Sequence, residues 1–188
     1  MEYSRSPLLE VEQSLLVLID VQDRLAPQIA NHAAIVARCG LLLQGARALG
    51  VPVLATEHCA AAIGPTLPVL RAQLDAGEMI AKRQFSAMAE SALPEALRRC
   101  GCRQVLLAGM EAHVCVLQTA LGVVDAGYEC WVVADAIGSR HGDDRLLAIE
   151  RLRESGVRVV SSEMVLFEWL GGADHPQFRT LIARIKEL

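Results

Sequence analysis

The sequence predicts an α/β fold: a doubly wound, six-stranded parallel sheet with helices on both faces. Short apolar runs recur along the chain, stretches with helical spacing of apolar residues alternate with them, and glycines end most of those stretches. Strands that alternate with helices of about 10–15 residues form right-handed βαβ units and one parallel sheet. We expect a single domain over residues 1–188, because a chain of this length buries a core without disulfides or metals.

The expected strands are short and rich in leucine and β-branched residues. The first, residues 14–22, reads SLLVLIDVQ, and its unbroken apolar run is typical of a strand buried on both faces. Similar runs predict the other strands at residues 51–57, 79–85, 103–110, 128–136 and 157–162.

Helices are expected between these strands, at residues 32–50, 91–101, 114–127 and 143–156, each ending at a glycine. Asp143 or Asp144 is expected to cap the last of them. A stretch with Gly and Pro at residues 60–68 leads toward a short helix. The segment 163–172 and a C-terminal helix at 176–188 follow the sixth strand.

Composition excludes several classes of protein. A hydrophobic fraction of 53% excludes intrinsic disorder, and no apolar run approaches the roughly 20 residues that span a bilayer. A net charge of -4 does not indicate the positively charged surface that binds nucleic acid. The acidic N-terminal segment does not resemble a secretory signal, so we expect a cytoplasmic protein with six free thiols. A mean hydropathy of +0.33 predicts a homo-oligomer, a dimer or larger.

Ligands of doubly wound sheets bind outside the carboxyl ends of the strands, so polar residues there are the candidates for a site. Such residues follow, or lie at the end of, five of the six expected strands: Asp20, Glu57, His58, Lys82, Glu111, His113, Cys115 and Asp135.

Three of these residues form a plausible reactive cluster. Asp20 reads equally well as a structural cap of a loop or as a general base, whose proton affinity partial burial would raise. Lys82 is either a surface lysine or, beside a thiol, a cation that stabilises the thiolate. Cys115 lies at the start of a helix after a buried strand, where unpaired amides and the helix dipole favour negative charge and hence a nucleophile.

The other cysteines are weaker candidates. Cys39 and Cys130 read as buried, inert thiols. Cys100 and Cys102 form a C-x-C pair, but no second pair with ligand spacing follows. Glycine-rich phosphate loops are absent from the sequence, so we expect no nucleotide cofactor and no other cofactor.

The segments LLVLIDVQ, AKRQFSA, LAGMEAHVCVLQTALGVVDAGYECWVVADAIGSR and VRVVSSE resemble the isochorismatase-like cysteine hydrolases. The resemblance extends from residue 14 to about residue 178. The sequence is most similar to the subgroup of isochorismatase domain-containing proteins. Their nucleophile motif is close to GMEAHVCV, and they carry HPQF, here residues 175–178.

The resemblance implies a catalytic triad in which Cys115 is the nucleophile, Asp20 the general base and Lys82 the cationic partner. It also implies a cis peptide bond between Met110 and Glu111, and an oxyanion hole made by the backbone N–H groups of Glu111 and Cys115. Dimers or larger assemblies are implied as well. Candidate residues of the substrate pocket are Phe85, Met88, His113 and Ile137.

Two groups of enzymes within the family that this sequence resembles differ from it at residues that bear on metal binding and on the reaction. Nicotinamidases carry an Asp-x-His and a further His after the second strand, which bind a metal. Here the segment reads TEHCAAAIGPTLPVL, in which only His58 is present, so we expect no metal. True isochorismatases, which cleave a vinyl ether, have no cysteine at the position of Cys115, and this reaction is therefore not expected.

Three hypotheses follow. The favoured one is a hydrolase that cleaves a small amide or related acyl compound through a thioester on Cys115. The second is a binding protein on the same fold that keeps the triad as a relic or uses Cys115 as a redox-responsive thiol. The third is a metal-dependent amidase of the nicotinamidase type.

Overall fold

The computed structural model describes residues 7–188 and has a six-stranded parallel sheet in the order β3-β2-β1-β4-β5-β6. This order confirms the doubly wound fold predicted from the sequence. The strands are β1 (Ser14–Ile19), β2 (Val53–His58), β3 (Met79–Lys82), β4 (Gln104–Met110), β5 (Glu129–Gly138) and β6 (Arg158–Val160).

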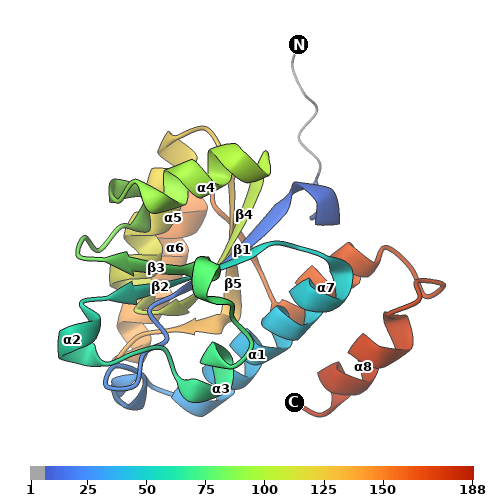
Figure 1. Ribbon diagram of the computed structural model, residues 1–188, viewed down its shortest axis with the longest axis horizontal. Helices are drawn as coiled ribbons and strands as arrows, with labels where there is room; N and C mark the ends of the chain where they lie inside the picture. The colour runs from blue at the N-terminus through green and yellow to red at the C-terminus, as the bar shows by residue number, and fades with distance from the viewer. Residues whose placement is uncertain (1–6) are drawn as a thin grey trace.

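Helices cover both faces of this sheet. Figure 1 shows α1, α7 and α8 on one side and α4, α5 and α6 on the other. The bounds of the helices are α1 (His32–Leu49), α2 (Ala60–Ile63), α3 (Pro68–Arg71), α4 (Ala92–Cys100), α5 (Leu117–Asp125), α6 (Gly142–Glu154), α7 (Ser162–Leu170) and α8 (Phe178–Lys186). Among the described residues, no helix is both long and apolar enough to cross a membrane.

The central strands are buried on both faces, as the first strand's sequence predicts. All residues of β1 and β4 are buried. Side chains alternate between the two layers: Leu16 and Leu18 pack with α1 and α7, whereas Leu15, Val17 and Ile19 pack with α4, α5 and α6. Burying both faces explains why these strands show no polar alternation in the sequence.

Some boundaries differ from those expected. Strand β2 extends to His58, beyond the expected end at Glu57, and β3 ends at Lys82 and not at residue 85. Helix α6 begins at Gly142 after His141, so Asp143 and Asp144 lie in its first turn and do not cap it. Their carboxylates are still favourable there, because the positive end of the helix dipole is nearby.

Asp135 does not end the fifth strand, contrary to expectation. The register of β4 against β5 shifts between Leu107 and Gly109, and β5 continues to Gly138. The Asp135 carboxylate accepts hydrogen bonds from the amide and hydroxyl of Ser162, at 2.7 and 2.6 Å, and lies 3.6 Å from Arg38. Asp135 therefore stabilises the start of α7 and is not part of the candidate site.

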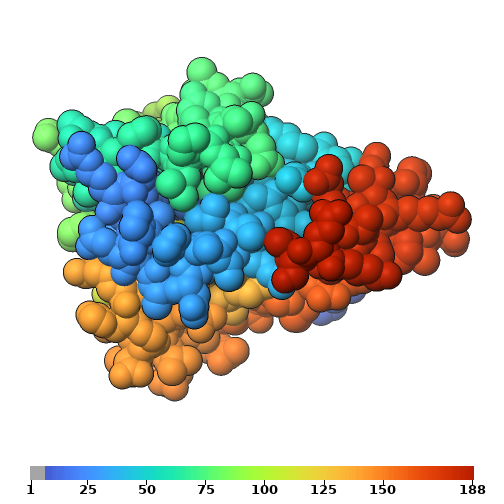
Figure 2. Space-filling model, turned by 90° about the horizontal axis from the view of Figure 1, so that it is seen from below, coloured from blue at the N-terminus to red at the C-terminus, as the bar shows by residue number. Residues whose placement is uncertain are grey.

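The C-terminal helix α8 lies at one end of the molecule. Figure 2 shows it in red beside α1, in light blue. Phe167 of α7 and Phe178 of α8 meet edge to face, with ring centroids 6.5 Å apart. This contact joins α8 to the layer that covers the sheet.

Gly109 permits β1 and β4 to approach closely just before the candidate site. Its φ is +123°, and a Cβ there would lie 2.1 Å from the backbone oxygen of Ile19. We predict that Gly109→Ala lowers the free energy of unfolding by about 2–3 kcal/mol, because backbone atoms must move to admit the methyl group. Urea denaturation measures this change.

Gly101→Ala is the matched control. Gly101 also has a positive φ, +69°, but a Cβ there meets nothing within 4 Å. Its substitution is expected to cost only about 1–2 kcal/mol, the penalty of the left-handed conformation. Equal destabilisation by the two variants would show that the approach of β1 and β4 is not tight.

Candidate active site

The candidate site lies where the strand order reverses. Strands β1 and β4 are neighbours in the centre of the sheet, and the chain leaves them toward opposite sides. Asp20 follows the last residue of β1, and Cys115 follows the end of β4. Lys82 is the last residue of β3, and its long side chain reaches past β2 to meet both of them.

Asp20 is held by two contacts from neighbouring strands. Its side chain is fully buried, and its backbone adopts a positive φ of 49°. Oδ1 accepts a hydrogen bond from the Thr56 hydroxyl at 2.6 Å, and Oδ2 lies 2.7 Å from the ammonium nitrogen of Lys82. Thr56, in β2, was not predicted as a site residue.

Lys82 has no exposed side-chain surface, so it is not the surface lysine that its residue type would favour. Besides Asp20, its Nζ donates to the backbone oxygens of Gln84 and Phe85, each at 3.2 Å. Nζ also lies 3.5 Å from Cys115 Sγ. These contacts satisfy a buried cation, which would otherwise be costly.

Cys115 lies on a π-helical turn, Ala112–Val116, that precedes α5. The Glu111 carbonyl accepts hydrogen bonds from the amides of Val114 and Val116, each at 3.1 Å. This wide turn replaces the first residues of the helix expected from residue 114. Turns of this kind occur frequently at functional sites. Cys115 is only 6% exposed, and its Sγ accepts a hydrogen bond from the Lys82 ammonium, beside the Asp20 carboxylate.

The environment of Cys115 favours the neutral thiol. Its pKa is raised from 9.0 to about 12, because burial and the Asp20 carboxylate together outweigh the Lys82 ammonium, which lowers it. The Lys82 ammonium acts in the expected direction, but desolvation outweighs it, so the pKa of Cys115 lies above 9.0 and not below it. A carboxylate beside a neutral thiol is the arrangement that general-base catalysis needs.

This pKa predicts how Cys115 reacts with iodoacetamide. Only the thiolate is alkylated, and its fraction grows about tenfold per pH unit below the pKa. We expect the labelling rate of Cys115 to rise from pH 7 past pH 10 without a plateau. Cys59, which is partly exposed, is the internal reference and should react faster than Cys115 at pH 7. A plateau for Cys115 below pH 9, read by peptide mass spectrometry, contradicts the structure.

The residues expected to form the oxyanion hole lie at the carboxyl end of β4. The peptide bond between Met110 and Glu111 is cis, as the resemblance implies. The Glu111 side chain accepts two hydrogen bonds from the Arg140 guanidinium, at 2.6 and 3.3 Å. This pair fixes the Glu111 side chain on the sheet edge close to Cys115.

The four expected pocket residues have different surroundings. Phe85 is 51% exposed, and its ring lies against His58 with centroids 5.4 Å apart. Met88 is partly buried and packs against the core layer that contains Cys115. Ile137, with 1% exposure, belongs to that core.

His113, the fourth, is two residues from Cys115 on the π-helical turn. Its Nδ1 hydrogen-bonds to the Ser139 hydroxyl at 2.9 Å, and its Nε2 lies 3.7 Å from the Asp144 carboxylate. Ser139 follows β5 and Asp144 lies at the start of α6. His113 therefore connects the π-helical turn that carries Cys115 to β5 and to α6.

Gln22 is a further residue that the sequence did not single out. Its side chain accepts a hydrogen bond from the His58 amide and donates to the oxygens of His58 and Gly64. A polar residue at the end of an apolar strand, two positions after Asp20, was the available signal for such a role. These bonds hold the loop after β1 against the end of β2.

His58 and Glu57 do not form a metal site in this structure. Glu57 instead accepts a hydrogen bond from the Thr66 amide at 2.7 Å. Within residues 7–188, no three His, Cys, Asp or Glu side chains are grouped so that they could hold a metal ion.

The comparisons with known proteins agree with this fold and with one another. Residues 14–164 match the family model described as Isochorismatase domain. Isochorismatase domain-containing protein 2A of Mus musculus is 39% identical over 176 residues, covering 94% of this chain and 84% of that protein.

Two solved structures are similar over nearly the whole chain. One is described as MAR1 ribonuclease from Caenorhabditis elegans: 30% identity, TM-score 0.90, covering 95% of this chain and 92% of that one. The other is the YcaC gene product of Escherichia coli, described as an octameric hydrolase of unknown specificity: 22% identity, TM-score 0.86, covering 98% and 99%. The chain therefore has the fold of isochorismatase-family hydrolases, and by the match of its sequence it belongs to the isochorismatase family.

Proposed function

We propose that this protein hydrolyses a small amide or a related acyl compound, with Cys115 as nucleophile, Asp20 as general base and Lys82 as their cationic partner. One observation carries the proposal: the thiol of Cys115 contacts a fully buried Asp20–Lys82 ion pair at the carboxyl end of a parallel sheet. A buried ion pair is weak evidence for stability, so its contact with a thiol favours a chemical role.

Acylation begins with the neutral thiol. Asp20 takes the proton from Cys115 Sγ as the sulfur attacks the substrate carbonyl carbon, and the carbonyl π electrons move to oxygen. The N–H groups of Glu111 and Cys115 are proposed to stabilise that oxyanion. When the tetrahedral intermediate collapses, the C–N bond breaks, and the amine leaves with the proton that Asp20 held.

Deacylation reverses the roles. Asp20, again a carboxylate, takes a proton from water, and the hydroxyl oxygen attacks the thioester. The C–S bond breaks, the acid is released and Cys115 regains its proton. The ammonium group of Lys82 stays beside Cys115 Sγ, because its Nζ is held by Asp20 and two backbone oxygens. This charge favours the sulfur anion as it forms and as it leaves.

The site favours a small substrate. Cys115 and Lys82 are 6% and 3% exposed, so only a compact group reaches the sulfur. The name of the C. elegans relative raises RNA as an alternative substrate. A net charge of -4 and a buried thiol provide neither the basic surface nor the open groove that RNA binding needs. Phe85, Met88, His113 and Ile137 remain the proposed pocket residues.

We also propose a homo-oligomer. Leu146 and Leu147 on α6 are 54% and 63% exposed, and the E. coli structural neighbour is described as octameric. Light scattering should give a mass well above the 20.3 kDa of one chain. A mass near that of one chain contradicts this assembly.

A screen of small primary amides by ammonia release tests the hydrolase. We expect Asp20→Asn to lower the rate on any substrate found by about 10²–10⁴-fold, the usual contribution of a general base. Asp23→Asn is the control, because Asp23 is exposed and close in sequence. If Asp20→Asn keeps full activity, Asp20 is not the base. If amides are inert and a model RNA is cleaved, the substrate class is wrong.

A further inference from the structure

A second pair of reactive groups lies at the opposite end of β4. Helix α4 ends at Cys100, and Gly101, with φ +69°, turns the chain so that Cys102 comes back to Cys100. The Cys102 amide donates a hydrogen bond to Cys100 Sγ at 3.2 Å. Only glycine adopts this conformation without strain, so the turn positions the two cysteines.

The two thiols differ in exposure and in protonation. Cys100 is exposed, whereas Cys102 is 4% exposed. The pKa of Cys102 is raised to about 12, mainly by burial and also by its contact with Cys100. The environment of Cys102 therefore favours the neutral thiol.

Cys100 Sγ accepts the hydrogen bond of the Cys102 amide, and Cys100 is the exposed member of the pair. Arg98, Arg99 and Arg103 flank the pair in sequence and add positive charge. In the neutral form, Cys100 donates weakly to the Leu97 oxygen, at 3.4 Å.

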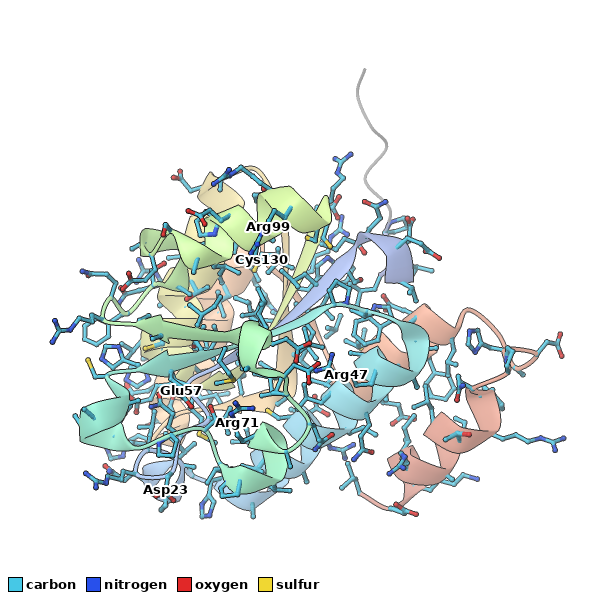
Figure 3. The ribbon with its side chains drawn as sticks, viewed as in Figure 1. Asp23, Arg47, Glu57, Arg71, Arg99 and Cys130 are labelled. Carbon is cyan, nitrogen blue, oxygen red and sulfur yellow. The ribbon has the colours of Figure 1, made fainter. Side chains whose placement is uncertain are left out.

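This pair is remote from the candidate active site. Cys102 precedes β4 and Cys115 follows it, and a strand of seven residues spans roughly 20 Å. In Figure 3, Arg99 and Cys130 are labelled at the top of the view, well separated from Glu57 near the end of β2. The hydrolase mechanism makes no use of Cys100 or Cys102.

We propose that Cys100 and Cys102 are a redox modification site that forms an intramolecular disulfide by exchange with a low-molecular-weight disulfide of the glutathione type. An accessible thiol beside a resolving thiol is the arrangement of redox-sensitive cysteines. The C-x-C spacing, the glycine turn and the N–H···S hydrogen bond bring the two cysteines together at the end of α4.

The exchange takes two steps. The Cys100 thiolate attacks one sulfur of the small disulfide, whose S–S bond breaks to release one small thiolate. Cys102 then loses its proton to solvent, and its sulfur attacks Cys100 Sγ and displaces the second small thiolate. The protein loses two electrons and two protons, and the small disulfide becomes two thiols.

Mass spectrometry of the full-length protein tests this site. The reduced protein is incubated with glutathione disulfide, quenched in acid and digested after glutamate, which gives a peptide of residues 96–111 whose cysteines are Cys100 and Cys102. We expect this peptide to become lighter by two hydrogens. Cys100 should also react about tenfold faster at pH 7 than the partly exposed Cys59, which lacks the second thiol.

Two variants separate the steps. Cys102→Ser or Cys102→Ala should stop at a glutathione adduct on Cys100, and Cys100→Ser should leave the buried Cys102 unmodified. Because the readout is mass alone, the result is independent of hydrolase activity. A stable glutathione adduct on Cys100 in the unsubstituted protein overturns the proposal, as does a Cys100 rate no higher than that of Cys59.

Discussion

Replacing Cys115 with alanine should lower kcat/KM for the amide substrate by roughly 10⁴–10⁶-fold, as removal of a nucleophile does in other acyl-transfer enzymes. Without the sulfur, the Asp20–Lys82 pair has no group to activate, and only weak hydrolysis by bound water remains. The free energy of unfolding should fall only by the cost of the small cavity that the sulfur leaves, because the thiol contributes to stability mainly through its burial. Steady-state kinetics and urea denaturation measure the two quantities.

Cys130→Ala is the matched control. Cys130 is 2% exposed, lies in β5 and belongs to the same core layer, and burial alone raises the pKa of its thiol. Its loss should cost comparable stability and leave kcat/KM unchanged. If the two variants retain equal activity, the nucleophile is not Cys115 and the proposed mechanism fails.

Lys82→Met should lower the free energy of unfolding by about 3–5 kcal/mol, because it leaves the Asp20 carboxylate buried without its ion-pair partner. The hydrolysis rate should also fall, since the charge 3.5 Å from Cys115 Sγ is lost. The adjacent Arg83 is exposed, so Arg83→Met should change stability by no more than about 0.5 kcal/mol.

A double variant separates charge from packing. Asp20→Asn combined with Lys82→Met removes both charges, and we expect it to recover much of the stability that Lys82→Met alone loses. Activity should not recover, because the base is absent. Additive losses of stability in the double variant would show that Asp20 and Lys82 do not interact as the 2.7 Å contact indicates.

Much of the fold and the places of the site residues could be predicted from the sequence. Apolar runs and glycine stops located the strands and most helices, and the rule for parallel sheets placed Asp20, Lys82 and Cys115 at one edge. The chain's order of elements does not by itself show that Lys82 reaches Asp20. That contact depends on β3 being next to β2, and on a lysine side chain long enough to pass it.

Other features depend on tertiary contacts that the sequence does not display. The π-helical turn around Cys115 depends on where Glu111 directs its carbonyl, and the extension of β5 beyond Asp135 depends on a register shift against β4. The protonation of Cys115 depends on burial, which exceeds the local effects of the helix start and Lys82. Thr56 was missed because a threonine within a strand has no distinctive pattern.

The central claim is that Cys115 carries an acyl group during turnover, and rapid quenching with an activated acetate ester tests it most directly. The protein is mixed with p-nitrophenyl acetate, and nitrophenolate release and the mass of each cysteine peptide are followed over time. The mechanism predicts a burst of nitrophenolate that matches transient acetylation of Cys115, lost in Cys115→Ala and slowed in Asp20→Asn. Acetylation elsewhere, or hydrolysis with Cys115 unmodified and an equal rate in Cys115→Ala, would contradict it.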